Sequence, residues 1–182
     1  MSNFCRTKIL ASIKSLNEIG LVLKKGVDII DFKDPSVGSL GALSIKQISF
    51  FLKSIPSNQL TSATIGDIKD IKIIKQKVIE LSKTSIDFIK IGFFFDEKKI
   101  KLLKNLKKLV KNKKIIAVLF ADNKPNVNLI REIKKIQFDG ILIDTKNKKN
   151  SNLRNYLSMK KLKNFIKISK KENLRIGLAG SL

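Results

Sequence analysis

Histidine is absent from this chain of 182 residues, and cysteine occurs only once, as Cys5. Without histidine, the chain cannot form a Ser-His-Asp or Cys-His nucleophilic site, and most kinds of zinc site are also excluded. A single cysteine excludes an internal disulfide and a metal site built from several cysteines. If the chain is an enzyme near neutral pH, Lys, Asp, Glu, Tyr or Cys5 must carry its protons.

Long hydrophobic runs are missing as well. The longest spans residues 115–121, whereas a membrane-spanning helix needs about 20 apolar residues. Residues 1–10 mix polar and apolar side chains and lack the apolar core of a secretory signal. These absences predict a cytoplasmic protein without a membrane partner.

Acidic residues are few: 15 Asp and Glu stand against 38 Lys and Arg, which gives a formal net charge of +23 at pH 7. Such an excess raises the hypothesis of a nucleic-acid partner. However, only four of the basic residues are arginine, the usual side chain for clamping phosphates and reading bases. We therefore interpret the charge as a solvated lysine surface that also attracts small phosphorylated substrates, and we expect no nucleic-acid partner.

Short β-rich runs alternate along the chain with longer stretches whose apolar residues recur about every 3.6 positions. This alternation predicts a parallel sheet covered by helices, an α/β fold of the TIM-barrel or (β/α)-barrel type. No linker interrupts the pattern, so we expect residues 1–182 to form a single barrel domain. A closed barrel needs eight strands. Only seven are predicted: 8–12, 27–33, 60–65, 86–92, 114–120, 140–144 and 174–179.

Helix boundaries are marked at two places. Ser15 with Glu18, and Ser44 with Gln47, have the spacing of a capping box before a helical apolar pattern.

The lysine-rich segment 97–114 could be taken for a nucleic-acid-binding arm. Its leucine periodicity instead predicts an amphipathic helix with a solvated outer face.

The first pattern with chemical content is IIDFKDP, residues 29–35. Because strand side chains alternate between faces, Asp31 and Lys33 point the same way, at the carboxyl end of a strand where barrel active sites are built. A strand-end ion pair is the alternative interpretation. The loop that follows, residues 36–42, has two glycines that would let backbone N–H groups approach an anion.

The second pattern places a lysine, Lys90, inside an apolar strand, in DFIKIGF of residues 87–93. Burying an ammonium group without a partner costs free energy, so we expect Lys90 to be paired or to be held partly neutral. A neutral lysine can act as a general base or form a Schiff base. The alternative is a lysine that extends along the strand end into solvent.

Small polar or acidic residues follow the carboxyl ends of several further strands, which indicates a binding site for a phosphorylated substrate at one end of the barrel. Since alternate strands supply one interior layer, Lys33, Lys90 and Asp144 on the second, fourth and sixth strands are predicted to converge. The residues predicted to contact the substrate or its phosphate are Ser39, Gly41, Ser62, Thr64, Asp67, Gly92, Asp122, Gly180 and Ser181.

These patterns belong to six stretches that lie between residue 26 and the last residue: GVDIIDFKDPSVGSLGA, SATIGD, DFIKIGFF, FAD, FDGILIDTKNK and GLAGSL. In this order they resemble the (5-formylfuran-3-yl)methyl phosphate synthase family. The combination of the first two stretches is the most specific. The resemblance implies a TIM-barrel lyase of methanofuran biosynthesis, which joins two glyceraldehyde 3-phosphate molecules into the phosphorylated furan aldehyde with loss of phosphate and water.

The resemblance also implies roles for five residues. Lys33, in the D-x-K-[DN]-P motif, would form a Schiff base with the substrate, and Lys90, in the second lysine motif, would accept a proton. Asp31 and Asp144 correspond to the family's acidic residues, and Lys148 to a supporting lysine. Because an imine itself draws electrons from the neighbouring carbon, no metal or organic cofactor is expected.

The sequence also departs from the family. The family continues past its LAGS motif to an eighth strand, whereas this sequence stops at Leu182, so we expect a barrel without that strand, truncated at its C-terminus relative to the family. Lys149, Asn150 and Asn155 replace the usual Asp, Gly and Asp. Three alternatives stay open: a class I aldolase-like barrel acting on sugar phosphates, an inactive truncated homologue, and a basic nucleic-acid-binding protein. Open strand edges would favour association into a homo-oligomer.

Overall fold

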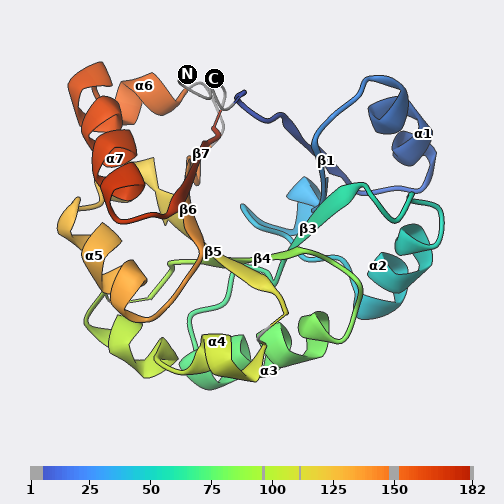
Figure 1. Cartoon of the computed structure of the whole chain (residues 1–182), viewed down its shortest axis with the longest axis horizontal. Helices are drawn as coiled ribbons and strands as arrows, with labels where there is room; N and C mark the ends of the chain where they lie inside the picture. Colours follow the sequence, from blue (N-terminus) through green and yellow to red (C-terminus); the bar gives the residue numbers. More distant parts are fainter. Residues whose placement is uncertain (1–5, 96, 111, 148–151, 181–182) are drawn as a thin grey trace, which may run out of the picture.

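The computed structural model describes residues 6–95, 97–110, 112–147 and 152–180. Within these residues the chain forms one sheet of seven parallel strands, whose order in the sheet is their order in the sequence. The sheet curls around a central axis (Figure 1). The strands are β1 (Leu10–Ile13), β2 (Ile29–Phe32), β3 (Leu60–Thr64), β4 (Phe88–Gly92), β5 (Lys114–Phe120), β6 (Gly140–Asp144) and β7 (Arg175–Leu178). All seven predicted strands are confirmed, the fifth and sixth with the predicted bounds.

Helical segments connect successive strands and lie on the outer side of the curled sheet (Figure 1). This arrangement confirms the predicted alternation of strands and helices. The segments are α1 (Asn17–Lys24), η1 (Pro35–Val37), α2 (Ile45–Leu52), α3 (Ile71–Ser82), η2 (Glu97–Leu103), α4 (Leu106–Leu109), η3 (Ala121–Asn123), α5 (Asn128–Lys135), α6 (Leu153–Tyr156) and α7 (Met159–Lys171).

The two predicted capping boxes differ in the structure. At α2 the box is complete: the Ser44 hydroxyl accepts the backbone N–H of Gln47 at 3.2 Å, and the Gln47 side chain accepts the backbone N–H of Ser44 at 3.0 Å. At α1 only half of it forms. The Glu18 carboxylate accepts the backbone N–H of Ser15 at 2.8 Å, but the helix begins at Asn17 and the Ser15 hydroxyl donates to Glu18 instead of capping.

The lysine-rich segment after β4 is not the continuous helix that its leucine spacing predicts. It forms the short helices η2 and α4, which are separated at Asn105, a residue in the left-handed conformation with φ of 73°. The apolar face is nevertheless buried as predicted, with Leu103, Leu106 and Val110 packed in the core. The pattern identified the buried side chains correctly but not the helical path that carries them.

Two apolar clusters fill the molecule. The larger lies between the outer face of the sheet and the helices, and it joins strand residues such as Ile30, Ile89 and Ile143 to helix residues such as Ile48 and Phe165. Both faces of β2 to β6 are largely buried, which explains the continuous apolar character of strands such as β5.

The smaller cluster lies on the inner face, where Leu40, Val118 and Phe120 pack with Phe94 and Leu142. This apolar wall of the interior is built largely on β5 and β6, and the charged residue Asp144 ends β6. The inner face of β2 and β4 carries the buried charged residues Asp31 and Lys90.

The strands β1 and β7 are the edges of the sheet: among the described residues, each pairs with one neighbour only. Figure 1 shows the gap between them. The predicted fold, a TIM-type barrel lacking one strand, is confirmed. A consequence is that inner-face residues of β1, such as Leu10 and Ser12, are exposed.

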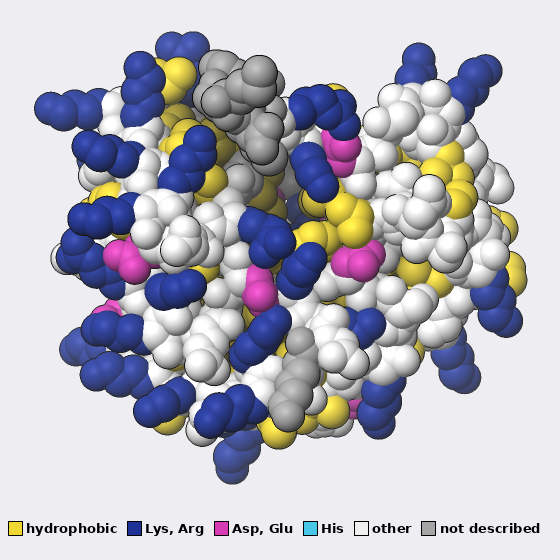
Figure 2. Space-filling model, viewed as in Figure 1, with side chains coloured by type: hydrophobic (Ala, Val, Ile, Leu, Met, Phe, Trp, Pro, Cys, Tyr) yellow, Lys and Arg dark blue, Asp and Glu magenta, His cyan; other side chains and the backbone are white. Residues whose placement is uncertain are grey.

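The surface is rich in lysine, as the composition predicts. Figure 2 shows Lys and Arg side chains over much of the face in view, with a few acidic side chains between them, and not gathered into one stripe. This distribution fits a solvated basic surface. In the part of the chain that the structure describes, none of the helices is long and apolar enough to cross a membrane.

Candidate active site

An ion pair between Asp31 and Lys90 lies in the interior of the barrel. Lys90 Nζ on β4 is 2.6 Å from Asp31 Oδ2 on β2, and the two residues are 3% and 0% exposed. The parallel register explains the contact: Ser62 on β3 is level with Asp31, and Lys90 is level with Thr64, two residues further along, so the lysine reaches back over β3. The expectation that Lys90 would be paired is therefore confirmed.

Two serine hydroxyls complete the surroundings of Asp31. Ser62 Oγ donates to Asp31 Oδ1 at 2.6 Å, and Ser12 Oγ on β1 donates to Asp31 Oδ2 at 2.8 Å. Together with Lys90, three donors compensate a carboxylate that has no contact with solvent. A buried carboxylate is retained only with such partners, so this arrangement fixes the position of the Asp31 side chain.

A second buried pair joins β2 to β6. Lys33 Nζ is 3.7 Å from Asp144 Oδ2, and the two side chains are 6% and 4% exposed. The other oxygen of Asp144 accepts the backbone N–H of Thr145 at 2.8 Å, which fixes the carboxylate. Lys33 also lines a cavity of about 230 Å³ at the carboxyl ends of β1 and β2, together with Ser12, Lys14, Glu18 and Pro35.

The structure thus places four of the five predicted catalytic residues in two buried ion pairs. The predicted approach of Lys33 on β2 to Asp144 on β6 is present, whereas Lys90 on β4 contacts Asp31, and the convergence of all three strands stays a prediction. The fifth residue, Lys148, lies outside the described residues. Imine formation requires an amine that a substrate can reach, and Lys33 lies next to a cavity. Proton transfer requires a second amine with a proton acceptor beside it, and Lys90 is hydrogen-bonded to a carboxylate.

The predicted anion-binding loop is held by a carboxylate. Asp67 Oδ2 accepts the backbone N–H of Ser39 at 2.9 Å, and Asp67 Oδ1 accepts that of Leu40 at 2.7 Å. Gly41 is needed for close packing, because a Cβ there would lie 1.9 Å from the carbonyl oxygen of Asp34. In this structure Asp67 therefore positions the loop that follows Lys33.

Three further predicted residues are structural neighbours of the site. The Thr64 hydroxyl donates to the carbonyl of Leu40 at 2.8 Å. A Cβ at Gly92 would lie 2.3 Å from the Phe94 ring, so this glycine makes room for the apolar wall. The Asp122 carboxylate accepts two backbone N–H groups of the segment after β6, at 2.8 and 2.9 Å, and holds that segment in place. Their substrate contacts remain predictions.

At the end of β7, Gly180 has a positive φ of 95° and packs against Thr145, where a Cβ would approach the threonine side chain to 2.7 Å. The Thr145 hydroxyl is buried, and the described residues offer it no hydrogen-bond partner. Ser181, the other half of the predicted phosphate cradle, lies outside the described residues. Within the described ranges, no group of three Cys, Asp or Glu side chains is placed to hold a metal ion.

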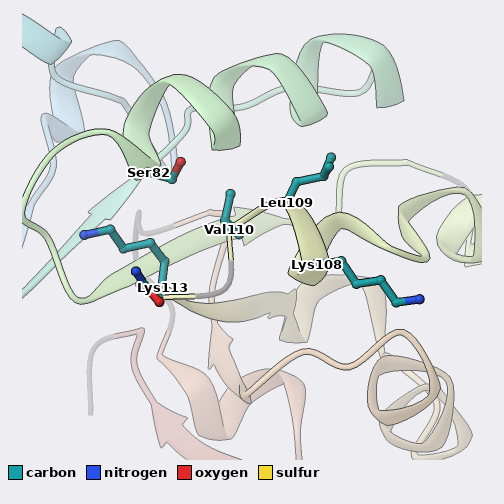
Figure 3. A pocket seen from close by; sticks show the side chains of 6 residues that line it. Ser82, Lys108, Leu109, Val110 and Lys113 are labelled. Carbon is teal, nitrogen blue, oxygen red and sulfur yellow. The ribbon is translucent and has the colours of Figure 1, made fainter.

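A larger hollow of about 380 Å³ lies away from these residues, where α3 and α4 approach the start of β5. Figure 3 shows that its two labelled lysines, Lys108 and Lys113, extend to opposite sides and do not converge on a common point. Lys113 Nζ instead donates to the carbonyls of Thr84 and Ile86, at 2.7 and 2.8 Å. In barrels the amino-terminal end of the strands serves stability, and we assign this region that role.

Comparison with known proteins gives the family. A family model described as 4-HFC-P synthase matches residues 9–182. The chain belongs to this family. A relative from Methanococcus maripaludis (strain C7), named (5-formylfuran-3-yl)methyl phosphate synthase, is 29% identical over 191 residues, which cover 96% of this chain and 79% of the relative. A relative of the same name from Methanothermobacter thermautotrophicus is 28% identical and covers 88% of this chain and 73% of its own length. The family is one of synthases, so the chain is an enzyme.

Solved structures support the fold alone. A 3-hexulose-6-phosphate synthase superimposes with a TM-score of 0.64 at 14% identity, covering 97% of this chain and 81% of its own. Phosphoribosyl anthranilate isomerase from Thermotoga maritima gives the same TM-score and identity, with 97% and 78% coverage.

One member of the site, Ser12, was not predicted from the sequence. Ser12 is level with Asp31 on the neighbouring strand, and only the observed strand pairing establishes this register.

Proposed function

We propose that this enzyme condenses two molecules of glyceraldehyde 3-phosphate into (5-formylfuran-3-yl)methyl phosphate, with release of one phosphate and two water molecules, in methanofuran biosynthesis. Family membership and the names of the relatives support the product. The observation that carries the proposal is the pair of buried lysines, Lys33 and Lys90, which lie with Asp144 and Asp31 at the carboxyl side of the barrel.

Lys33 begins the reaction as the nucleophile. It is the lysine of the pair that lines the cavity, so an aldehyde can reach its amine. Attack on the aldehyde carbon and loss of water give a protonated imine. The Asp144 carboxylate, 3.7 Å from Nζ, stabilises the positive charge that the imine carries.

Lys90 removes a proton from the carbon next to the imine. The imine acidifies this carbon because it accepts the electron pair that the C–H bond leaves behind. Lys90 needs a free amine for this step. The proton that it holds in the ion pair can pass to Asp31 along their 2.6 Å hydrogen bond, which frees the lone pair.

The electron pair expels the phosphate from the first substrate, which leaves an enol whose terminal carbon is nucleophilic. This carbon attacks the central carbon of the second substrate after that molecule has isomerised to its ketone form. Ring closure with loss of two water molecules forms the furan, and hydrolysis of the imine releases the product from Lys33. The positive surface of the chain attracts both phosphorylated substrates by long-range electrostatics.

Product analysis tests this proposal. The purified chain is incubated with glyceraldehyde 3-phosphate, and the mixture is analysed by mass spectrometry for the furan aldehyde and by a colorimetric assay for phosphate. We expect both products in equal amounts. Lys33→Ala and Lys90→Ala should each abolish them, whereas Lys46→Ala, which removes an exposed lysine, should not.

Two outcomes would contradict the proposal. An acyclic condensation product without phosphate release would identify an aldolase-like reaction on sugar phosphates. Furan product in the Lys90→Ala variant at the rate of the unmodified chain would exclude Lys90 as the base.

A further inference from the structure

Asp31 and the three side chains that bind it differ in their access to solvent. Asp31, Lys90 and Ser62 are 0%, 3% and 1% exposed. Ser12 is exposed, and it lines the same cavity as Lys33. Ser12 therefore connects a fully buried acid–base pair to the space in which the substrate binds.

The hydrogen bonds form a continuous path to this exposed residue. Lys90 Nζ and Ser12 Oγ both contact the same oxygen of Asp31, Oδ2, at 2.6 and 2.8 Å. A proton can thus travel from the amine to the carboxylate and from there to the hydroxyl without any rearrangement of the backbone. Ser62 contacts the other oxygen, Oδ1, and its buried hydroxyl leads no further.

We propose that Ser12 is the outlet through which the Asp31–Lys90 pair exchanges protons with solvent. The inference rests on the proposed function, in which Lys90 takes one proton from the substrate carbon in each cycle. That proton must leave before the next cycle, and both members of the pair are closed to solvent. Ser12 acts through Asp31, and Ser62 has the separate role of positioning the carboxylate.

The transfer balances without any further reactant. Before Lys90 accepts the substrate proton, it has passed its own proton to Asp31, so an N–H bond has broken and an O–H bond has formed on Asp31 Oδ2. The Ser12 hydroxyl then turns to accept this proton: the O–H bond on Asp31 breaks, a bond to Ser12 Oγ forms, and the original hydroxyl proton of Ser12 moves to a water molecule in the cavity. The ion pair of ammonium and carboxylate is thereby restored for the next cycle, and no electron is gained or lost.

The experiment follows a deuteron that begins on the substrate. Glyceraldehyde 3-phosphate deuterated at the carbon next to the aldehyde is incubated in ordinary water, and unreacted substrate is recovered and analysed by mass spectrometry. If the removed deuteron escapes to solvent, substrate that has reformed carries only hydrogen; if it cannot escape, it stays among the few protons that Lys90 and Asp31 hold, and part of the reformed substrate regains it. The ratio of exchange to imine formation is independent of how much of the sample is folded.

We expect Ser12→Ala to lower this exchange ratio by about tenfold, a small part of what a placed proton-transfer group contributes. Ser12→Thr keeps a hydroxyl and should restore exchange. The matched control is Ser62→Ala, which removes a hydrogen bond from the same carboxylate but keeps the outlet, and it should preserve the ratio even if turnover slows. Exchange in Ser12→Ala equal to that of the unmodified chain, or an equal loss in Ser62→Ala, would overturn the inference.

Borohydride trapping of the Lys33 imine in each variant distinguishes failure of the proposed function from failure of the inference about Ser12. No imine in the unmodified chain would defeat the proposed function itself. If Ser12→Ala alone forms no imine, Ser12→Val replaces it, because valine has the shape of the Ser12→Thr side chain but no hydroxyl. Exchange in Ser12→Val as fast as in the unmodified chain would then exclude Ser12 as the outlet.

Discussion

Asp31 shows how much of the site depends on a single residue. Its carboxylate is fully buried and is compensated by Lys90, Ser12 and Ser62. Sequence alternation was enough to place Asp31 on the interior face. The identity of its serine partners was not predictable. It depends on the register between β1, β2 and β3, and a single serine in a strand does not reveal that register.

Asp31→Asn should destabilise the chain strongly. The substitution leaves the Lys90 ammonium buried without an anion, and breaking a buried pair in this way lowers the free energy of unfolding by about 3–5 kcal/mol. Urea unfolding at neutral pH measures the effect. Glu80→Gln, which breaks the exposed pair with Lys77, is the control and should change stability little. Equal stabilities of the two variants would contradict the assigned ion pair.

Gly41→Ala should disrupt the loop after Lys33. The added Cβ would meet the backbone carbonyl of Asp34, which no side-chain rotation can relieve, so we expect a lower melting temperature and loss of imine formation. The control is Gly20→Ala, on an exposed part of α1 with no atom near the added Cβ; it should stabilise the helix by about 1 kcal/mol. Normal imine formation in Gly41→Ala would show that this loop does not position Lys33.

At the scale of the elements, the strands were more predictable than the helices. Parallel strands buried on both faces read as apolar runs, and all seven were found. The segment around Asn105 was not predictable from its leucine spacing, since burial of one face is compatible with either a continuous or a broken helix. The cap of α1 differs from its pattern because the chain enters that helix at Asn17 instead of at Ser15.

The two capping sequences should therefore contribute differently to stability. Ser44→Ala removes a complete cap and should lower the free energy of unfolding by about 1 kcal/mol. Ser15→Ala removes a hydroxyl that does not cap its helix, and we expect a smaller loss. Urea titrations of both variants provide the comparison, and a larger loss for Ser15→Ala would contradict the observed cap geometry.

Carboxylates at helix starts predict how stability depends on pH. The backbone N–H of Ile73, followed by that of Lys72, holds the pKa of Asp70 below its ordinary value of 3.8. The backbone N–H of Lys14 is the main cause that holds the pKa of Glu18 below 4.5. Since the folded state binds these protons less readily than the unfolded state, the stabilisation is complete above the ordinary values and is lost as pH falls through the lowered ones.

We accordingly expect the free energy of unfolding to be nearly constant between about pH 7 and about pH 5, and to decrease at more acidic pH. Urea unfolding across this range tests the expectation. Asp70→Asn keeps a capping side chain but cannot titrate, so the acidic decrease should be smaller in this variant. The same decrease in both proteins would show that Asp70 does not contribute.

At the scale of the whole molecule, the barrel topology followed from the alternation of elements, and the number of strands followed from counting them. The placement of Lys33 and Asp144 on facing strands was predictable for the same reason. The exposure of β1 and the access of Ser12 to the cavity were not predictable from the sequence. Both depend on the curvature of the sheet and on β1 being one of its edges.

The formal charge of +23 should make stability depend on salt. Mutual repulsion among like charges destabilises the compact state, and screening reduces it. We expect the melting temperature to rise as sodium chloride increases from about 0.05 M to about 0.5 M. A melting temperature that falls over this range would mean that specific ion pairs outweigh the repulsion.

The most direct test of the central claim is to identify the lysine that binds the substrate. The chain is incubated with glyceraldehyde 3-phosphate and borohydride, and the adduct is located by mass spectrometry of peptides. We predict a reduced imine on Lys33, unchanged in Lys90→Ala and absent in Lys33→Ala. An adduct on Lys90 or on exposed lysines such as Lys46 in place of Lys33, or no adduct in the folded chain, would contradict the account.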